Sequence, residues 1–227
     1  FTNPHSITGD AMLKVDELGL PISIAKSIQI PETVRPYNRD RLNTYYMNRN
    51  TSYPGCSGVV KKGSKRLYKI DYLDEKYQLQ DGDIIMRDMI TGDVIGFNRQ
   101  PSLLFSSMSS HKVIVLDKGE TLRMNVSACS LYNADFDGDA MNGLCALNIQ
   151  SRNELQKLAS VGNWMVSYKD SAPMMGAFQD SLIGMAEFTR SDVFLDKYHA
   201  MAMFSQIDTY KKNLNFTKKN YQSRELV

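Results

Sequence analysis

Cysteine is scarce in this chain of 227 residues, and its three cysteines lie far apart at Cys56, Cys129 and Cys145. No CxxC pair occurs, so we expect no zinc site within the chain. An odd number of free thiols is typical of a reducing compartment, so we expect an intracellular protein. Apolar runs are also short. None approaches the ~18 residues of a membrane span and no secretory signal opens the chain, so we expect no membrane partner.

Neither sign of charge dominates, because 27 Lys and Arg stand against 25 Asp and Glu. A disordered tail is excluded, since 42% of the residues are hydrophobic, with nine Phe and twelve Tyr in the chain. At roughly 150 residues per domain, this length indicates one large domain, or one domain with part of another. The first residue is Phe and not Met, so we expect a piece of a longer protein.

The basic residues are unevenly distributed. Between residues 35 and 66 there is one acid, Asp40, and eight basic residues: Arg35, Arg39, Arg41, Arg49, Lys61, Lys62, Lys65 and Arg66. Such a run is either a solvated basic face or a surface that meets phosphate groups. The sequence alone leaves both interpretations open.

The pattern of apolar residues predicts short helices first and strands afterwards. Residues 16–28 carry a short helical signal after Gly19-Leu20-Pro21, with Pro21 suited to the first helical turn, and Asn38 can cap a second helix. Between about 58 and 147, short strands separated by glycine turns are typical of a small barrel. The strands are predicted at 83–87, 93–97, 112–116 and 122–126, with the first two paired across a turn at Thr91-Gly92.

After residue 150 the pattern becomes helical, beginning with a capping box from Ser151 to Glu154. We therefore expect an α+β fold. In this fold short N-terminal helices precede a β-barrel, and a helical extension follows it at the C-terminus.

The segment from Asn133 to Asp139 carries three carboxylates at alternate positions, Asp135, Asp137 and Asp139. Like charges this close repel one another, and a bound cation is the usual reason to tolerate them. Gly138 adopts backbone angles that other residues resist, so a tight loop can turn all three carboxylates toward one point. Magnesium favours such oxygen ligands.

Two other interpretations of this loop are weaker. In a calcium EF-hand loop aligned on Gly138, Asn133 would stand where Asp is required and Leu144 where Glu is required. A solvated acidic turn without metal is common, but Leu131, Tyr132 and Phe136 are expected to hold this loop against a packed body.

Residues 133–139 resemble the NADFDGD signature of the largest subunit (Rpb1 or beta-prime type) of multisubunit DNA-dependent RNA polymerases. Residues 97–103 resemble the FNRQP(S/T)L element of the same family, at the expected upstream spacing. Three further segments are similar to family landmarks, in the right order: DELGLP at 16–21, YPG at 53–55 and GAFQD at 176–180. The resemblance extends to about residue 205.

The resemblance implies that the barrel is a double-psi β-barrel. It implies an active-site domain over 1–165, with barrel strands at about 58–147, and the start of a helical pore or funnel-side domain over 166–227. In the family, the aspartates that match Asp135, Asp137 and Asp139 hold the catalytic Mg²⁺. A second Mg²⁺ arrives with the NTP, and the reaction is nucleotidyl transfer to an RNA 3′ end.

The resemblance also assigns substrate-binding residues. Arg99 matches an arginine that contacts the ribose of the incoming nucleotide; otherwise it is a surface arginine. Asn133 matches an asparagine that distinguishes ribose from deoxyribose, a role that suits an amide because it both donates and accepts hydrogen bonds. Pro101 is expected to shape the loop that carries Arg99. His111 matches a family histidine.

The chain departs from the family pattern after the aspartates, where the usual His and Pro are missing from residues 140–147, and at Leu104, where the family has His. These departures favour divergent polymerases of large cytoplasmic DNA viruses, especially asfarvirus-like ones. Two alternatives stay open: a silencing-type RNA-dependent RNA polymerase barrel, and a non-catalytic polymerase-like module that binds nucleic acid or metal.

The partners implied by the resemblance are the second-largest polymerase subunit, other polymerase subunits, the DNA template, the nascent RNA and NTPs. The implied location is a cytoplasmic viral factory or virion for a viral protein, and the nucleus for a cellular eukaryotic one. The chain alone is expected not to polymerise.

Overall fold

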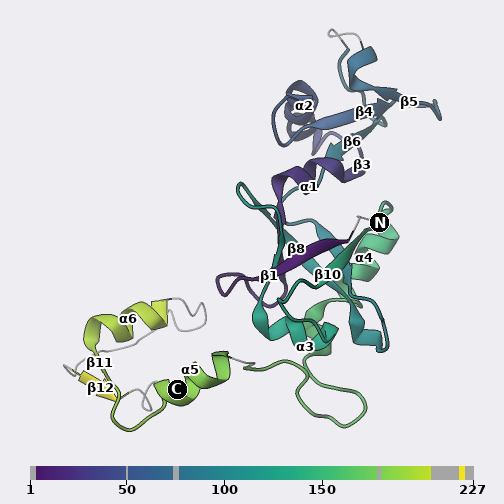
Figure 1. The fold of residues 1–227 in the computed structure, drawn as a ribbon. Coiled ribbons are helices and arrows are strands. Elements are labelled where there is room, and N and C mark those ends of the chain that lie inside the picture. Colours follow the sequence, from purple (N-terminus) through teal and green to yellow (C-terminus); the bar gives the residue numbers. More distant parts are fainter. Residues whose placement is uncertain (1–3, 50, 74–76, 178–179, 206–219, 223–227) are drawn as a thin grey trace. The chain divides into compact units, whose positions relative to one another are not determined.

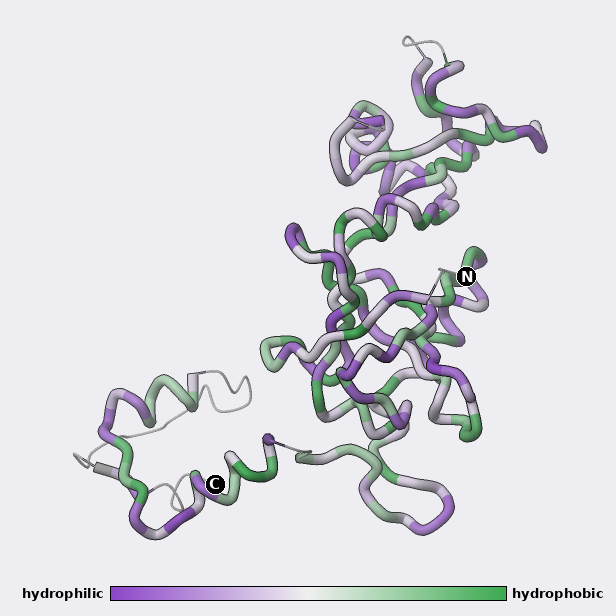
Figure 2. The backbone as a smooth tube through the Cα atoms, in the orientation of Figure 1, coloured by the Kyte–Doolittle hydropathy of each residue, from purple (hydrophilic) through white to green (hydrophobic). Residues whose placement is uncertain are grey.

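The computed structural model describes residues 4–49, 51–73, 77–177, 180–205 and 220–222 (Figure 1). The chain divides into two compact units, Phe1–Met175 and Gly176–Val227. Apolar stretches along the chain are short (Figure 2), and none of the described helices is long and apolar enough to cross a membrane.

Six strands of the first unit close into a barrel, in which each strand bonds to the next in the order β1-β10-β7-β8-β2-β9. The pairs β1–β9 and β2–β8 are parallel and the other pairs are antiparallel. The strands are β1 (His5–Gly9), β2 (Glu17–Pro21), β7 (Val94–Asn98), β8 (Met108–Leu116), β9 (Leu122–Met124) and β10 (Ala140–Cys145).

The barrel begins much earlier in the sequence than the range 58–147 that was expected to hold its strands. Both β1 and β2 precede that range. The helix expected after Gly19-Leu20-Pro21 is α1 (Ile22–Ser27), with Pro21 at its N-cap, but residues 17–21 before it form strand β2. The physical reason is that Leu18 and Leu20 of β2 are both fully buried. A short continuous apolar run cannot be distinguished from a helix by its periodicity.

A second, four-stranded sheet has its own core. Its order is β3-β6-β4-β5, formed by β3 (Gln29–Thr33), β4 (Cys56–Val60), β5 (Leu67–Lys69) and β6 (Ile84–Asp88). Helix α2 (Arg39–Asn48) packs Leu42 and Tyr46 into this core, and the short helix η1 (Ile70–Tyr72) adds Ile70. Asn38 is the N-cap of α2 as predicted, although its side-chain oxygen accepts from the Arg35 N–H instead of from the first turn of the helix.

The predicted hairpin of 83–87 with 93–97 is wrong. These segments are strands, but β6 joins the four-stranded sheet and β7 joins the barrel. The turn at Thr91-Gly92 does form, with Gly92 at a φ of +96°. Between the two strands the Met89 N–H bonds to the carbonyls of Ala25 and Ile28, where the chain passes from the sheet to the barrel.

The basic run divides into two parts in this sheet. On the α2 side, Arg39 forms an ion pair with Asp81, and Arg41 forms one with Glu32. Around the turn between β4 and β5 lie Lys61, Lys62, Lys65 and Arg66, with the Lys61 ammonium 4.5 Å from the centre of the Tyr77 ring. Contact of this part with phosphate groups stays a prediction.

Several short elements follow β7. They are η2 (Phe105–Ser107), η3 (Val126–Ala128), α3 (Cys129–Tyr132), α4 (Ile149–Lys157) and η4 (Val161–Trp164). Helix α4 lies against β7 and β8 (Figure 1). The capping box predicted from Ser151 is wrong, because Asn148 is the N-cap and its side chain accepts from the Ser151 N–H at 2.7 Å.

The second unit contains helices α5 (Asp180–Phe188) and α6 (Lys197–Ser205) and an antiparallel pair, β11 (Phe194–Asp196) with β12 (Asn220–Gln222). The expectation of a helical domain from residue 166 stays a prediction. Phe178 and Gln179 of the GAFQD landmark lie outside the described residues.

Candidate metal centre

The aspartate loop connects a short helix to a barrel strand. Helix α3 ends at Tyr132, and Asn133 follows in the left-handed conformation, with φ 48° and ψ 46°. Asn tolerates this conformation better than most residues. Gly138, at a φ of +124°, then turns the chain into β10. The loop is therefore a tight connection whose ends are both fixed by regular structure.

The loop brings its three carboxylates together. One oxygen from each of Asp135, Asp137 and Asp139 lies within 4.8 Å of the others. The Asp135 N–H donates to Asp139 Oδ2 at 3.1 Å, which closes the loop on itself. Asp135 and Asp137 are exposed, whereas Asp139 is half-buried. Three hard oxygen donors in this arrangement fit a divalent cation such as Mg²⁺.

The apolar residues of the loop hold it against the barrel core, as the sequence predicted. Leu131 and Tyr132 are buried, and the half-buried Phe136 packs on the core beside Gly9. The EF-hand interpretation is wrong, because Leu144, which would be the twelfth loop residue, lies in strand β10 and not before a helix.

The carboxylates differ in their electrostatic surroundings. Hydrogen bonding with Asp137, together with partial desolvation and the neighbouring negative charges, raises the pKa of Asp135 above its usual range. The hydrogen bond from Arg99 lowers the pKa of Asp139 below its usual range. The centre therefore combines one carboxylate stabilised in its charged form with one that is crowded by other acids.

Arg99 is held next to the aspartates by a neighbouring strand. It follows β7 directly, and its Nε and Nη2 lie 2.7 and 3.0 Å from Oδ2 and Oδ1 of Asp139. The loop that carries it is anchored by the Asn98 side chain, which donates to the Ser107 carbonyl at 2.9 Å. Pro101 lies two residues further along this loop, after a cis peptide bond, and is exposed.

The residues expected at the site are thus placed in two groups. Arg99 contacts the aspartate loop, and the exposed Asn133 begins that loop. Pro101 belongs to the Arg99 loop.

Three buried rings, those of Phe97, His111 and Tyr132, pack against one another next to the two segments that carry the site. The ring of Phe97 meets the rings of His111 and Tyr132 edge-on, at centroid distances of 5.8 and 5.7 Å. His111 Nε2 lies 2.7 Å from the Tyr132 hydroxyl. Phe97 precedes Arg99 by two residues and Tyr132 directly precedes Asn133, so this cluster joins the two segments of the site. The sequence indicated His111 and Tyr132 separately but not their contact with Phe97, because the cluster depends on contacts between distant segments.

The buried histidine predicts a loss of stability in mild acid. Burial lowers the pKa of His111 in the folded chain to about 4. In the unfolded chain the histidine pKa is ~6.5, so between these two values the unfolded chain is protonated at this residue and the folded chain is not. The contribution of His111 to the free energy of unfolding is therefore fully present above pH 6.5 and is lost as the pH falls toward 4. Between pH 7 and 5 we expect a loss of about 2 kcal/mol from this residue.

Urea denaturation at pH 7 and pH 5 measures this effect. The His111→Gln variant, which has no imidazole to protonate, should lose less stability over the same interval. An equal loss in the variant and the parent chain would contradict the assignment to His111.

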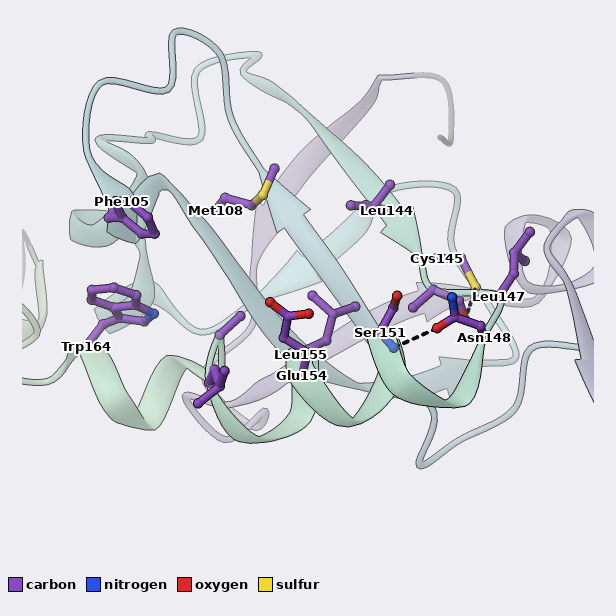
Figure 3. A pocket seen from close by; sticks show the side chains of 13 residues that line it. Phe105, Met108, Leu144, Cys145, Leu147, Asn148, Ser151, Glu154, Leu155 and Trp164 are labelled. Atoms are coloured by element: carbon purple, nitrogen blue, oxygen red, sulfur yellow. Dashed lines mark hydrogen bonds between the residues drawn. The ribbon is translucent and has the colours of Figure 1, made fainter.

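Two cavities lie near these elements. One, of about 460 Å³, is lined by residues adjacent to the site, among them Asn98, Gln100 and Ala140. A larger apolar cavity of about 860 Å³ runs along α4, with Phe105 and Trp164 at one end and Leu147 and Asn148 at the other (Figure 3). Neither Arg99 nor any of the three aspartates lines this larger cavity.

Comparison with known proteins places the chain among polymerase subunits. The family described as RNA polymerase Rpb1, domain 2, matches residues 1–161. The chain is 44% identical over 211 residues to the DNA-directed RNA polymerase RPB1 homolog of African swine fever virus, a match that covers 90% of this chain and 15% of the relative.

A cellular relative is also similar. The chain is 39% identical over 213 residues to the DNA-directed RNA polymerase II subunit RPB1-B of Trypanosoma brucei brucei, covering 93% of this chain and 12% of the relative. The chain therefore spans about 12 to 15% of the length of these curated relatives.

Proposed function

Because this chain belongs to the family of the largest subunits of DNA-directed RNA polymerases, we propose that it is the catalytic segment of such an enzyme. The proposed reaction is the transfer of nucleotides from NTPs to an RNA 3′ end on a DNA template. The observation that carries the proposal is the convergence of three carboxylates within 4.8 Å, in a loop with the full NADFDGD sequence.

We propose Asp135, Asp137 and Asp139 as the residues that hold Mg²⁺. Their oxygens are the donors that this cation prefers, and their mutual repulsion is relieved when a cation binds. When bound, Mg²⁺ supplies Lewis-acid activation and charge compensation for phosphoryl chemistry. The protein contributes position: the loop is short, closed by the Asp135–Asp139 hydrogen bond and supported by buried rings.

Arg99 and Asn133 are proposed to bind the sugar of the incoming nucleotide. The Arg99 guanidinium has donors beyond those that bond to Asp139, and Asn133 presents an exposed amide at the start of the loop. Pro101 is proposed to shape the Arg99 loop. The closed barrel is proposed to have the double-psi topology, an assignment supported by its two parallel and four antiparallel pairings.

The second-largest subunit, other subunits, DNA, RNA and NTPs are proposed as partners, because this chain covers a minor part of its relatives. The silencing-type polymerase is a weaker alternative, since the relatives reported above are DNA-directed. RNA synthesis by the assembled polymerase, with the aspartates replaced one at a time, tests the proposal. Unchanged synthesis in every variant would refute it.

The role proposed for Asn133 predicts a loss of sugar discrimination. Replacing Asn133 by Ala removes an amide that can bond to a 2′-hydroxyl, so we expect the preference for NTP over dNTP to fall by about 3- to 10-fold, the worth of one neutral hydrogen bond. The measurement is the ratio of kcat/KM for UTP and dUTP in the assembled enzyme. The Asn163→Ala variant, altered far along the chain from the loop, is the control. An unchanged ratio in Asn133→Ala would refute the proposed contact between Asn133 and the sugar.

A further inference from the structure

The Arg99 side chain makes a contact that the proposed sugar-binding role does not require. Its guanidinium bonds to both oxygens of Asp139. We infer that Arg99 is also a positioning residue for the metal: it orients the Asp139 carboxylate, so that the metal site and the nucleotide site share one guanidinium. This inference rests on the proposed function and deepens it.

The hydrogen bonds of Asp139 leave it one preferred position for a cation. A carboxylate offers about four lone-pair positions, two on each oxygen. Oδ2 accepts from Arg99 Nε at 2.7 Å and from the Asp135 N–H at 3.1 Å, while Oδ1 accepts from Arg99 Nη2 at 3.0 Å. Oδ2 is therefore saturated, and one lone pair of Oδ1 remains. The fork thus leaves Oδ1 as the Asp139 oxygen that can accept a cation.

The same guanidinium keeps donors for a second ligand. Arginine has five N–H groups in a rigid plane, and the contact with Asp139 uses one on Nε and one on Nη2. Three N–H groups remain, two of them on Nη1. Because the plane is rigid, fixing one edge on Asp139 also fixes the direction of the remaining donors. A sugar hydroxyl bound by these donors and a cation bound by Asp139 would therefore be held at a fixed position relative to each other.

Both ends of this contact are fixed by one pair of strands. Arg99 follows the last residue of β7, and Asp139 precedes the first residue of β10. These strands pair antiparallel, with Asn98 opposite Asn142. The Ile7 N–H also donates to the Asp139 carbonyl at 3.0 Å. The backbone at each end is thus held by ladder hydrogen bonds, and the side chains meet across a fixed separation.

A simple counter-charge role predicts the opposite effect on metal binding. If Arg99 only neutralised Asp139, its removal would strengthen the binding of a divalent cation, because a positive charge 2.7 Å from a ligand oxygen repels the cation. If Arg99 orients the ligand, its removal weakens metal binding. Loss of a hydrogen-bonding partner of a metal ligand typically costs about 10- to 100-fold in affinity. The sign of the change therefore separates the two roles.

The experiment measures Mn²⁺ binding to the assembled polymerase in the absence of nucleotide, by the electron paramagnetic resonance signal of free Mn²⁺. We expect Arg99→Gln to weaken binding by about 10- to 100-fold. Arg99→Lys keeps the charge but loses the planar fork, so it should also bind more weakly than the parent enzyme. The matched control is Arg123→Gln, which removes an arginine that contacts Asp10 with one nitrogen at 3.4 Å, and its Mn²⁺ affinity should not change.

Unchanged or tighter Mn²⁺ binding in Arg99→Gln would overturn the inference. The Asp137→Asn variant separates this failure from failure of the proposed function. If Asp137→Asn binds Mn²⁺ as well as the parent enzyme, the aspartates are not the metal site and the proposed function fails. If Asp137→Asn loses Mn²⁺ while Arg99→Gln retains it, only the role of Arg99 is refuted. Co-purification of each variant with the other subunits, with an unchanged circular dichroism spectrum, establishes that it is folded.

Discussion

Replacing Asp137 by Asn is expected to reduce RNA synthesis by the assembled polymerase by more than about 10³-fold. The change is nearly isosteric, and it removes one of three charged oxygen ligands from the proposed metal centre. Metal-ion stabilisation of transition-state charge is worth several kcal/mol, and each ~1.4 kcal/mol corresponds to a tenfold change in rate. The measurement is kcat for single-nucleotide addition to a preformed RNA primer on its template.

The stability of the protein should not fall with the activity. Asp137 is exposed and lies among like charges, so its neutralisation removes repulsion and breaks no buried contact. Asp117→Asn, at an exposed position in the turn before β9, is the control and should keep full activity. An Asp137→Asn enzyme that retains more than a tenth of the parent rate would refute the proposed metal role.

Replacing Arg87 by Met is expected to destabilise the chain by about 3–5 kcal/mol. Arg87 is 3% exposed. Its Nε donates to Glu32 at 2.6 Å, and its Nη1 and Nη2 donate to Asp93 at 2.8 Å each. Burial opposes the charge of Arg87, but the hydrogen bonds to Asp93 and Glu32 still raise its pKa above the ordinary value. Removing one partner of such a pair leaves buried charges without compensation, which costs this amount.

Urea denaturation of the 227-residue chain measures the change in the free energy of unfolding. The matched control is Arg39→Met, which breaks the half-exposed pair with Asp81 and should cost no more than about 1 kcal/mol. Similar losses in the two variants would contradict the structural role of Arg87. Because Glu32 lies in the four-stranded sheet and Asp93 directly precedes barrel strand β7, Arg87→Met should also weaken the coupling between the two cores.

The local parts of the site were predictable from the sequence. The aspartate loop lies within seven residues, and the geometry of Asn133 and Gly138 follows from their residue types. Arg99 lies 40 residues from Asp139, so the resemblance to the polymerase family, and not periodicity, placed it near the site. The contact of Arg99 with both oxygens of Asp139 depends on the register between β7 and β10. No local sequence pattern predicts this register, because the two strands are distant in the sequence.

The fold was predictable only where neighbours in sequence are neighbours in space. Strands β6 and β7 were found as strands, but their partners were wrong because each pairs with distant segments. Strand β2 was not predicted as a strand, since its parallel partner β8 is almost a hundred positions away. Helix α4 begins at Ile149, two residues before the predicted capping residue Ser151. The reason is that the Asn148 side chain accepts a hydrogen bond from the Ser151 N–H and so caps the helix earlier.

Strand β1 has a consequence for any dissection of the enzyme. It fills the place between β9 and β10, and its residue Ile7 bonds to the backbone of Asp139. A fragment that began after Gly9 would leave two strand edges without partners, and open edges recruit other chains. It would also free the carbonyl of Asp139 from its only strand contact in the described residues. Fragments designed to contain the aspartate motif therefore need residues 5–9, although these lie more than a hundred positions before it.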